Sequence, residues 1–164
     1  MKAYKQKIKE EIITDCTYMI DMLQSYCLDR EGNRVESNTF FLLMAADLTR
    51  YMCEQNEPGT KLADLKDNAL KLYDRSEMKS ASLHLCCPTK MSRDLHHANF
   101  IYEFKNDTSK AIKICEASVL KCQANLQTAD EETYVEANHL MELLKENIAI
   151  WRGQDPTRID EGDF

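Results

Sequence analysis

Residues 36–54 read ESNTFFLLMAADLTRYMCE. This stretch indicates the fold class, and its arginine raises the question of what binds it. If it forms a helix, its apolar residues recur every three or four positions and share one wide face. These residues are Phe40, Leu43, Met44, Leu48, Tyr51 and Met52. Arg50 lies beside that face, and an unpaired buried cation is very costly. We therefore expect Arg50 to have a partner, which is either a carboxylate of the protein or an anion that binds and leaves.

The same three-and-four spacing continues as far as Trp151 and indicates further amphipathic helices. We expect six helices, over residues 4–26, 37–54, 62–83, 88–104, 108–126 and 128–151. Candidate N-caps are Ser37 for the second helix, Asp107 or Thr108 for the fifth, and Thr128, in a capping box, for the sixth. Short loops between helices favour antiparallel neighbours. The predicted fold is all-α, an antiparallel bundle or array of about six helices, with a helical repeat array as the alternative.

The composition fits one globular domain and excludes some classes of ligand. The chain has 164 residues, of which 43% are hydrophobic and 30% charged, and its net charge is −7. An acidic chain is not built for nucleic acid or anionic membranes, and its longest apolar run, residues 40–46, is too short to span a bilayer. We expect a helical domain over residues 1–152 and an acidic, disordered tail over residues 153–164.

The cysteines and histidines form no recognisable catalytic or metal-binding pattern. Seven cysteines, an odd number without a Cys-x-x-Cys pair, follow an N-terminus that lacks a secretory signal. Reduced thiols in a cytoplasmic protein are the simplest interpretation. Zinc binding and a Cys–His nucleophile are the alternatives, and the residue spacings match neither. We expect no enzyme activity, no metal and no cofactor.

The last predicted helix has a distinctive sequence, YVEANHLMELLKENIAIW over residues 134–151. It resembles the C-terminal signature of the 14-3-3 proteins. Residues 36–54 are similar to the fifth helix of that family, residues 95–103 to the seventh, and residues 4–16 to part of the fourth. The order and spacing agree over residues 4–151, so the resemblance implies the C-terminal portion of a 14-3-3 fold.

The resemblance implies a cytoplasmic adaptor that binds phosphoserine or phosphothreonine segments of client proteins in a groove. Arg50 and Tyr51 match the phosphate-binding pair of the family, and a guanidinium fork with a neighbouring phenol suits a phosphate. Asn147 matches the residue that binds the main chain of the bound peptide. The remaining matched groove positions are His96, Glu103, Leu95, Leu140, Leu143, His139 and Trp151.

Several positions depart from the family pattern. The first three helices of the family have no counterpart here, and they carry its dimer contacts and two further basic phosphate ligands. Leu43 stands where the family has a Lys, His96 where it has an Asn, and His139 and Asn99 where it has apolar groove residues. If His96 and His139 replace the missing donors, phosphopeptide binding should strengthen as the pH falls from about 7.5 to 6.

Two functional hypotheses follow. In the first, the chain is a phosphopeptide-binding adaptor of the 14-3-3 type with weakened phosphate binding. In the second, it is a degenerate helical interaction module in which a carboxylate such as Glu103 holds Arg50, and partners bind without phosphate. The predicted partners are phosphorylated proteins. A homo-oligomer is also possible, because Ile8 and Met19 contribute to apolar surface on more than one side of the first helix.

Overall fold

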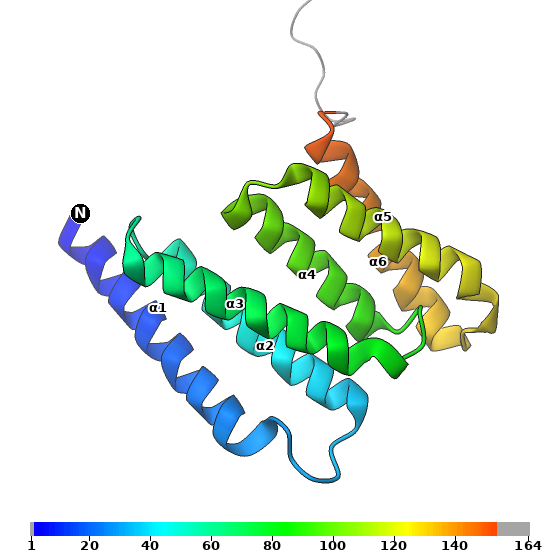
Figure 1. The fold of residues 1–164 in the computed structure, drawn as a ribbon, viewed down its shortest axis with the longest axis horizontal. Coiled ribbons are helices and arrows are strands. Elements are labelled where there is room, and N and C mark those ends of the chain that lie inside the picture. Colours follow the sequence, from blue (N-terminus) through cyan, green and yellow to red (C-terminus); the bar gives the residue numbers. More distant parts are fainter. Residues whose placement is uncertain (1, 154–164) are drawn as a thin grey trace, which may run out of the picture. The chain divides into compact units, whose positions relative to one another are not determined.

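A computed structural model describes residues 2–153, and side chains from residue 4 onward. The described part of the chain is all-α and contains six α-helices and no strand, as predicted (Figure 1). The chain forms two compact units, and the boundary between them lies between Leu83 and His84. The tail was expected over residues 153–164; of these, Gly153 is described, and residues 154–164 lie outside the described residues.

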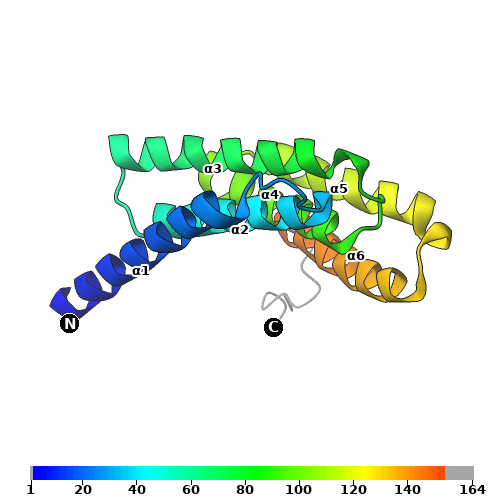
Figure 2. The same ribbon diagram turned by 90° about the horizontal axis from the view of Figure 1, so that it is seen from below.

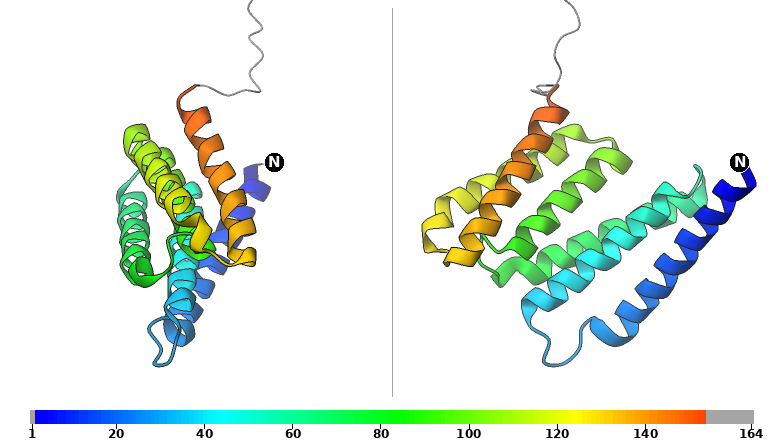
Figure 3. Two further views of the ribbon diagram at one scale, coloured as in Figure 1. Left: turned by 90° about the vertical axis from the view of Figure 1, so that its right-hand side faces the viewer. Right: turned by 180° about the vertical axis from the view of Figure 1, so that it is seen from behind.

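The first unit is built around the helix that contains the opening stretch. Its helices are α1 (Lys2–Met22), α2 (Val35–Glu54) and α3 (Thr60–Lys79), with a π-helical turn at Leu23–Cys27 and a 3₁₀ turn at Ser80–Ser82. Figure 3 shows α1 and α2 side by side and antiparallel. Both α1 and α3 contact α2, and Figure 2 shows α2 between them. This central place explains why α2 is the most apolar helix of the unit.

The buried face of α2 differs from the predicted face at two positions. Leu42, Ala45 and Ala46 are fully buried, whereas Phe40 and Tyr51 are exposed. Because α2 contacts α1 and α3 on different sides, its buried surface includes the small residues between the large ones. Placing Phe40 and Tyr51 on the buried face was therefore wrong, and Tyr51 is left with its ring at the surface.

The helix α1 buries little of its apolar surface. Among its residues 4–22, only Cys16 is buried, and Ile12, Ile13 and Ile20 are half-buried. The exposed large apolar side chains of α1 are Tyr4, Ile8, Tyr18, Met19 and Met22. Of the residues expected to form an exposed apolar patch on this helix, Ile8 and Met19 are exposed, and self-association through this face stays a prediction.

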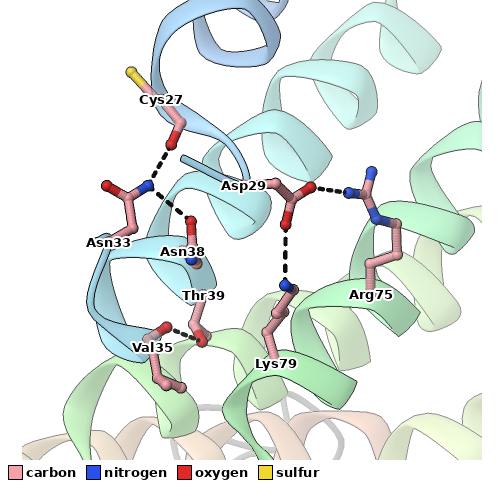
Figure 4. A network of polar contacts seen from close by, with 8 residues as sticks. All are labelled: Cys27, Asp29, Asn33, Val35, Asn38, Thr39, Arg75 and Lys79. Atoms are coloured by element: carbon pink, nitrogen blue, oxygen red, sulfur yellow. Dashed lines mark hydrogen bonds and ion pairs between the residues drawn. The ribbon is translucent and has the colours of Figure 1, made fainter. Parts of the chain in front are cut away.

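A polar network fastens the connection between α1 and α2 onto α3 (Figure 4). The Asp29 carboxylate accepts from Arg75 at 2.7 Å and pairs with Lys79 at 3.0 Å. These two cations, Lys79 first, hold the pKa of Asp29 below its usual value. In the same loop, the Asn33 amide donates to the Cys27 carbonyl at 2.6 Å and to Asn38 at 3.0 Å.

The second unit is a three-helix arrangement in which each helix contacts the other two. It comprises α4 (Pro88–Lys105), α5 (Thr108–Asn125), a 3₁₀ turn at Leu126–Thr128, and α6 (Glu131–Trp151). Its fully buried centre is formed by Met91, Ala98, Phe100, Ala111, Cys115, Cys122, Ala137 and Leu144. These residues recur at helical spacing, so each of the three helices presents one face to the core of this unit.

The helix ends confirm some expectations and correct others. Pro88 occupies the first turn of α4, and the Asp107 carboxylate caps α5 by accepting from the Lys110 amide at 2.9 Å. The α-helical part of α3 ends at Lys79, earlier than expected, because the chain tightens into the 3₁₀ turn.

Two predicted N-caps were wrong. The first turn of α2 already contains Ser37, because the Asn38 amide bonds to the Arg34 carbonyl at 3.1 Å. In α6 the cap is Asp130, whose carboxylate accepts from the Thr133 amide at 2.8 Å. A carboxylate at this position also complements the positive end of the helix dipole. Thr128 instead belongs to the 3₁₀ turn before α6.

Candidate functional site

The predicted phosphate-binding pair lies near the C-terminal end of α2. The Arg50 side chain is only 17% exposed, and its Nη1 donates to Glu54 Oε1 at 2.8 Å. Its guanidinium carbon lies 4.7 Å from the centre of the Tyr51 ring, which is within cation–π range. Tyr51 itself is 42% exposed. The pair therefore combines a fixed cation with an accessible phenol.

A buried tyrosine supports Arg50 from α3. Tyr73 is fully buried and donates to Asp47 Oδ1 at 2.8 Å. Burial is the main cause that raises the pKa of Tyr73, and the charge of Asp47 adds to it. Arg50 also hydrogen-bonds the Tyr73 phenol and opposes this rise. The Tyr73 hydroxyl thus connects Asp47 to Arg50, which lie three residues apart on one face of α2.

Glu54 contacts Arg50 but was not among the predicted site residues. The sequence contained a signal for it, since an acidic residue four positions after an arginine on a helix is at ion-pair spacing. The second hypothesis placed a carboxylate such as Glu103 on Arg50; within α2, Arg50 pairs with the Glu54 carboxylate.

The groove positions of α6 form one stripe of the second unit. Leu140, Leu143, Asn147 and Trp151 follow each other at helical spacing, and all four are half-buried. His139 lies one position away and is exposed. Their neighbours Met141 and Leu144, in contrast, belong to the buried core. The stripe is therefore partly accessible apolar surface with one amide in it, which suits contact with an extended peptide.

The groove positions of α4 show the same partial exposure. Leu95 and His96 are half-buried, and Glu103 is exposed. Asn99 connects this helix to α6, because Asn147 Nδ2 donates to Asn99 Oδ1 at 2.8 Å. This bond fixes the orientation of the Asn147 amide. It leaves the second N–H of Asn147 and its Oδ1 as hydrogen-bonding groups for a ligand.

An aromatic stack completes the contact between α4 and α6. The rings of Tyr102 and Trp151 lie 4.8 Å apart with an interplanar angle of 17°. Tyr102 is 39% exposed and Trp151 is half-buried. The stack fixes the plane of the Trp151 ring. Tyr102 was not among the predicted site residues, and no pattern in the sequence identifies its partner across the two helices.

The residues that could hold a metal or act as a nucleophile are dispersed or buried. Within residues 2–153, no group of three His, Cys, Asp or Glu side chains could hold a metal ion. All seven cysteines are free thiols. Burial raises the pKa of Cys53 to about 11 and that of Cys115 to about 12, so these thiols hold their protons at neutral pH.

Two further observations bear on ligands. None of the described helices is both long and apolar enough to cross a membrane. A cavity of about 450 Å³ lies at the start of α5, and none of the predicted site residues lines it. Its lining residues are Thr108, Ser109, Ile112, Lys113, Glu116 and Arg152.

Comparison with known proteins gives a consistent result. Residues 1–152 match the family model described as 14-3-3 protein. A 14-3-3 protein homolog of Encephalitozoon cuniculi is 29% identical over 94% of this chain and 61% of its own length. The 14-3-3-like protein G-BOX factor 14 lambda of Arabidopsis thaliana is 26% identical over 98% and 64%, respectively. Human 14-3-3 protein beta/alpha is 26% identical over 99% and 65%. The chain thus spans less than two thirds of each of these relatives.

Proposed function

Because the chain belongs to the 14-3-3 family, we propose that it is an adaptor that binds protein segments carrying phosphoserine or phosphothreonine. The observation that carries the proposal is the pair formed by Arg50 and Tyr51. A guanidinium fork binds phosphate through charge-assisted hydrogen bonds, and a phenol beside it supplies another donor. Arg50 is held in place by Tyr51 and Tyr73, so little conformational freedom is lost when a phosphate binds.

The other residues of the proposal belong to the second unit. Asn147 binds the main chain of the client, since its amide keeps both a donor and an acceptor beside the bond to Asn99. The apolar contacts are assigned to Leu95, Leu140, Leu143 and Trp151, and polar contacts to His96, Glu103 and His139. All of these residues are half-buried or exposed, which supports this assignment. A direct role for His96 and His139 in phosphate binding stays a prediction.

The free thiols support a reducing compartment, and we assign the protein to the cytoplasm. Its partners in this proposal are phosphorylated proteins, with a second copy of the chain as a further partner through the exposed face of α1. The residues support an adaptor rather than an enzyme, because the thiols with raised pKa values are poor nucleophiles at neutral pH.

The proposal is tested by titrating two peptide libraries into the protein. Both libraries are degenerate around a fixed central position, which is phosphoserine in one and serine in the other. We expect binding to the phosphoserine library only, and we expect Arg50→Ala to weaken it on the order of 10²-fold, because two charge-assisted bonds are lost. Tyr51→Phe should weaken it less, since only the phenol donor is removed.

The matched control is Arg75→Ala. Arg75 belongs to the same unit and also pairs with a carboxylate, that of Asp29, so its removal makes the same change in charge. This variant should keep the preference for phosphoserine. Equal binding of the two libraries by the wild-type protein would reject the proposal and leave a module that binds partners without phosphate.

A further inference from the structure

Glu54 has no role in the function proposed above, although it contacts Arg50, the proposed phosphate-binding residue, directly. Its Oε1 accepts from Arg50 Nη1 at 2.8 Å. We propose that Glu54 is an internal counter-ion that sets the affinity of the Arg50 site for anions. A phosphate on a client must bind against the negative charge of this carboxylate, and removing that charge strengthens binding. The inference rests on the proposed function and concerns the regulation of the same site.

The two side chains of the Arg50–Glu54 ion pair differ in how easily they can move. The Arg50 side chain is 17% exposed, stacks on Tyr51 and hydrogen-bonds to Tyr73. The Glu54 side chain is 40% exposed and lies on the last turn of α2. Ion pairs at such exposed positions are weak. When an anion approaches, the pair therefore opens by movement of Glu54, while Arg50 stays in place.

Arg50 has a second carboxylate nearby, that of Asp47, and the two carboxylates differ in how firmly they are held. Asp47 lies near Arg50 on the other side, since both contact the Tyr73 phenol. The Tyr73 hydrogen bond holds the half-buried Asp47 in place, whereas the more exposed Glu54 side chain can turn toward water. Of the two carboxylates on α2 beside Arg50, Glu54 is thus the one whose charge can leave the site. We infer that its position determines how strongly the site attracts a dianionic phosphate.

The size of the effect follows from Coulomb's law. A unit negative charge about 6 Å from a phosphate dianion, at a water-like dielectric constant of about 80, changes affinity by about tenfold. Glu54→Gln removes the charge and keeps an oxygen that can accept from Arg50, so the arginine stays oriented. We expect this variant to bind a phosphoserine peptide about tenfold more tightly than the wild-type protein, with no gain for the unphosphorylated peptide.

The experiment measures the binding of a phosphoserine peptide and its serine twin, taken from the libraries above, by fluorescence anisotropy at constant salt. The control is Glu31→Gln, which makes the same change in net charge at an exposed residue before the start of α2. It should leave both affinities unchanged. Glu54→Ala provides a second variant with the charge removed, and thermal unfolding checks that each variant is folded.

The outcomes separate this inference from the proposed function. Tighter phosphopeptide binding by Glu54→Gln, but not by Glu31→Gln, supports the inference. If the wild-type protein prefers the phosphopeptide and neither Glu54 variant binds it more tightly, the inference is wrong and the proposed function stands. If neither the wild-type protein nor the Glu54 variants distinguish the two peptides, both are rejected.

Discussion

The substitution Tyr73→Phe tests how the structure holds Arg50 and Asp47 in place. The hydroxyl of Tyr73 is the only group that this change removes, and the ring stays in its buried position. That hydroxyl donates to the Asp47 carboxylate at 2.8 Å and contacts Arg50. Because Tyr73 is fully buried, water cannot replace the lost donor at the same position without repacking.

The expected cost can be worked out from the type of hydrogen bond. A hydrogen bond to a charged group contributes about 1.5–3 kcal/mol to stability. We therefore expect Tyr73→Phe to lower the free energy of unfolding by about 2 kcal/mol. In an Asp47→Asn background, the acceptor is neutral, and the same substitution should cost only about 1 kcal/mol. The difference between these two costs measures the contribution of the Asp47 charge.

The assay is urea denaturation followed by circular dichroism at 222 nm, with the four proteins of the double-mutant cycle. Tyr18→Phe is the control, because Tyr18 is 65% exposed and its hydroxyl faces solvent. Its loss of stability should stay within about 0.5 kcal/mol. A loss for Tyr73→Phe that is no larger than for Tyr18→Phe would refute the structural role assigned to the Tyr73 hydrogen bond.

Three further predictions concern the second unit and α1. Asn99→Val should weaken phosphopeptide binding several-fold in calorimetry while costing about 1 kcal/mol of stability, because the Asn147 amide loses the partner that orients it. Stability should fall as the pH rises above 9: the unfolded Cys115 thiol ionises there, whereas its folded pKa is about 12. This thiol alone contributes a loss of about 1.4 kcal/mol by pH 10, and Cys115→Ala should remove that part of the pH dependence in urea titrations. Finally, sedimentation velocity at high protein concentration should show self-association that Met19→Glu reduces, and a wild-type protein that stays monomeric would contradict the role given to α1.

Local features of the sequence predicted most of the fold. The three-and-four spacing identified all six helices; Asp107, one of the two N-caps expected for the fifth helix, caps it, and the fourth helix begins at residue 88 as expected. The errors arose where several residues compete for one role. Ser37 and Thr128 are both good N-cap residues, but the chain enters its helices at Arg34 and Asp130. Cap choice depends on where the loop approaches the helix, and the helical period does not contain that information.

In the candidate site, contacts within one helix can be predicted from the sequence, whereas contacts between helices cannot. Arg50 and Glu54 are four residues apart on one helix, so their ion pair could be read from the sequence. The bond between Asn147 and Asn99 and the stack of Trp151 on Tyr102 join two helices. Contacts of this kind depend on the packing of α4 against α6, which sequence spacing within one helix does not determine.

The proposed function requires that the protein bind the phosphate of its clients. The most direct measurement is the release of a bound phosphoserine peptide when a phosphatase removes its phosphate, followed by fluorescence anisotropy and compared with an inactivated phosphatase. We expect dephosphorylation to release the peptide, with an affinity at least on the order of 10²-fold lower for the product. A peptide that stays bound with the same affinity after losing its phosphate would show that the protein does not recognise phosphate.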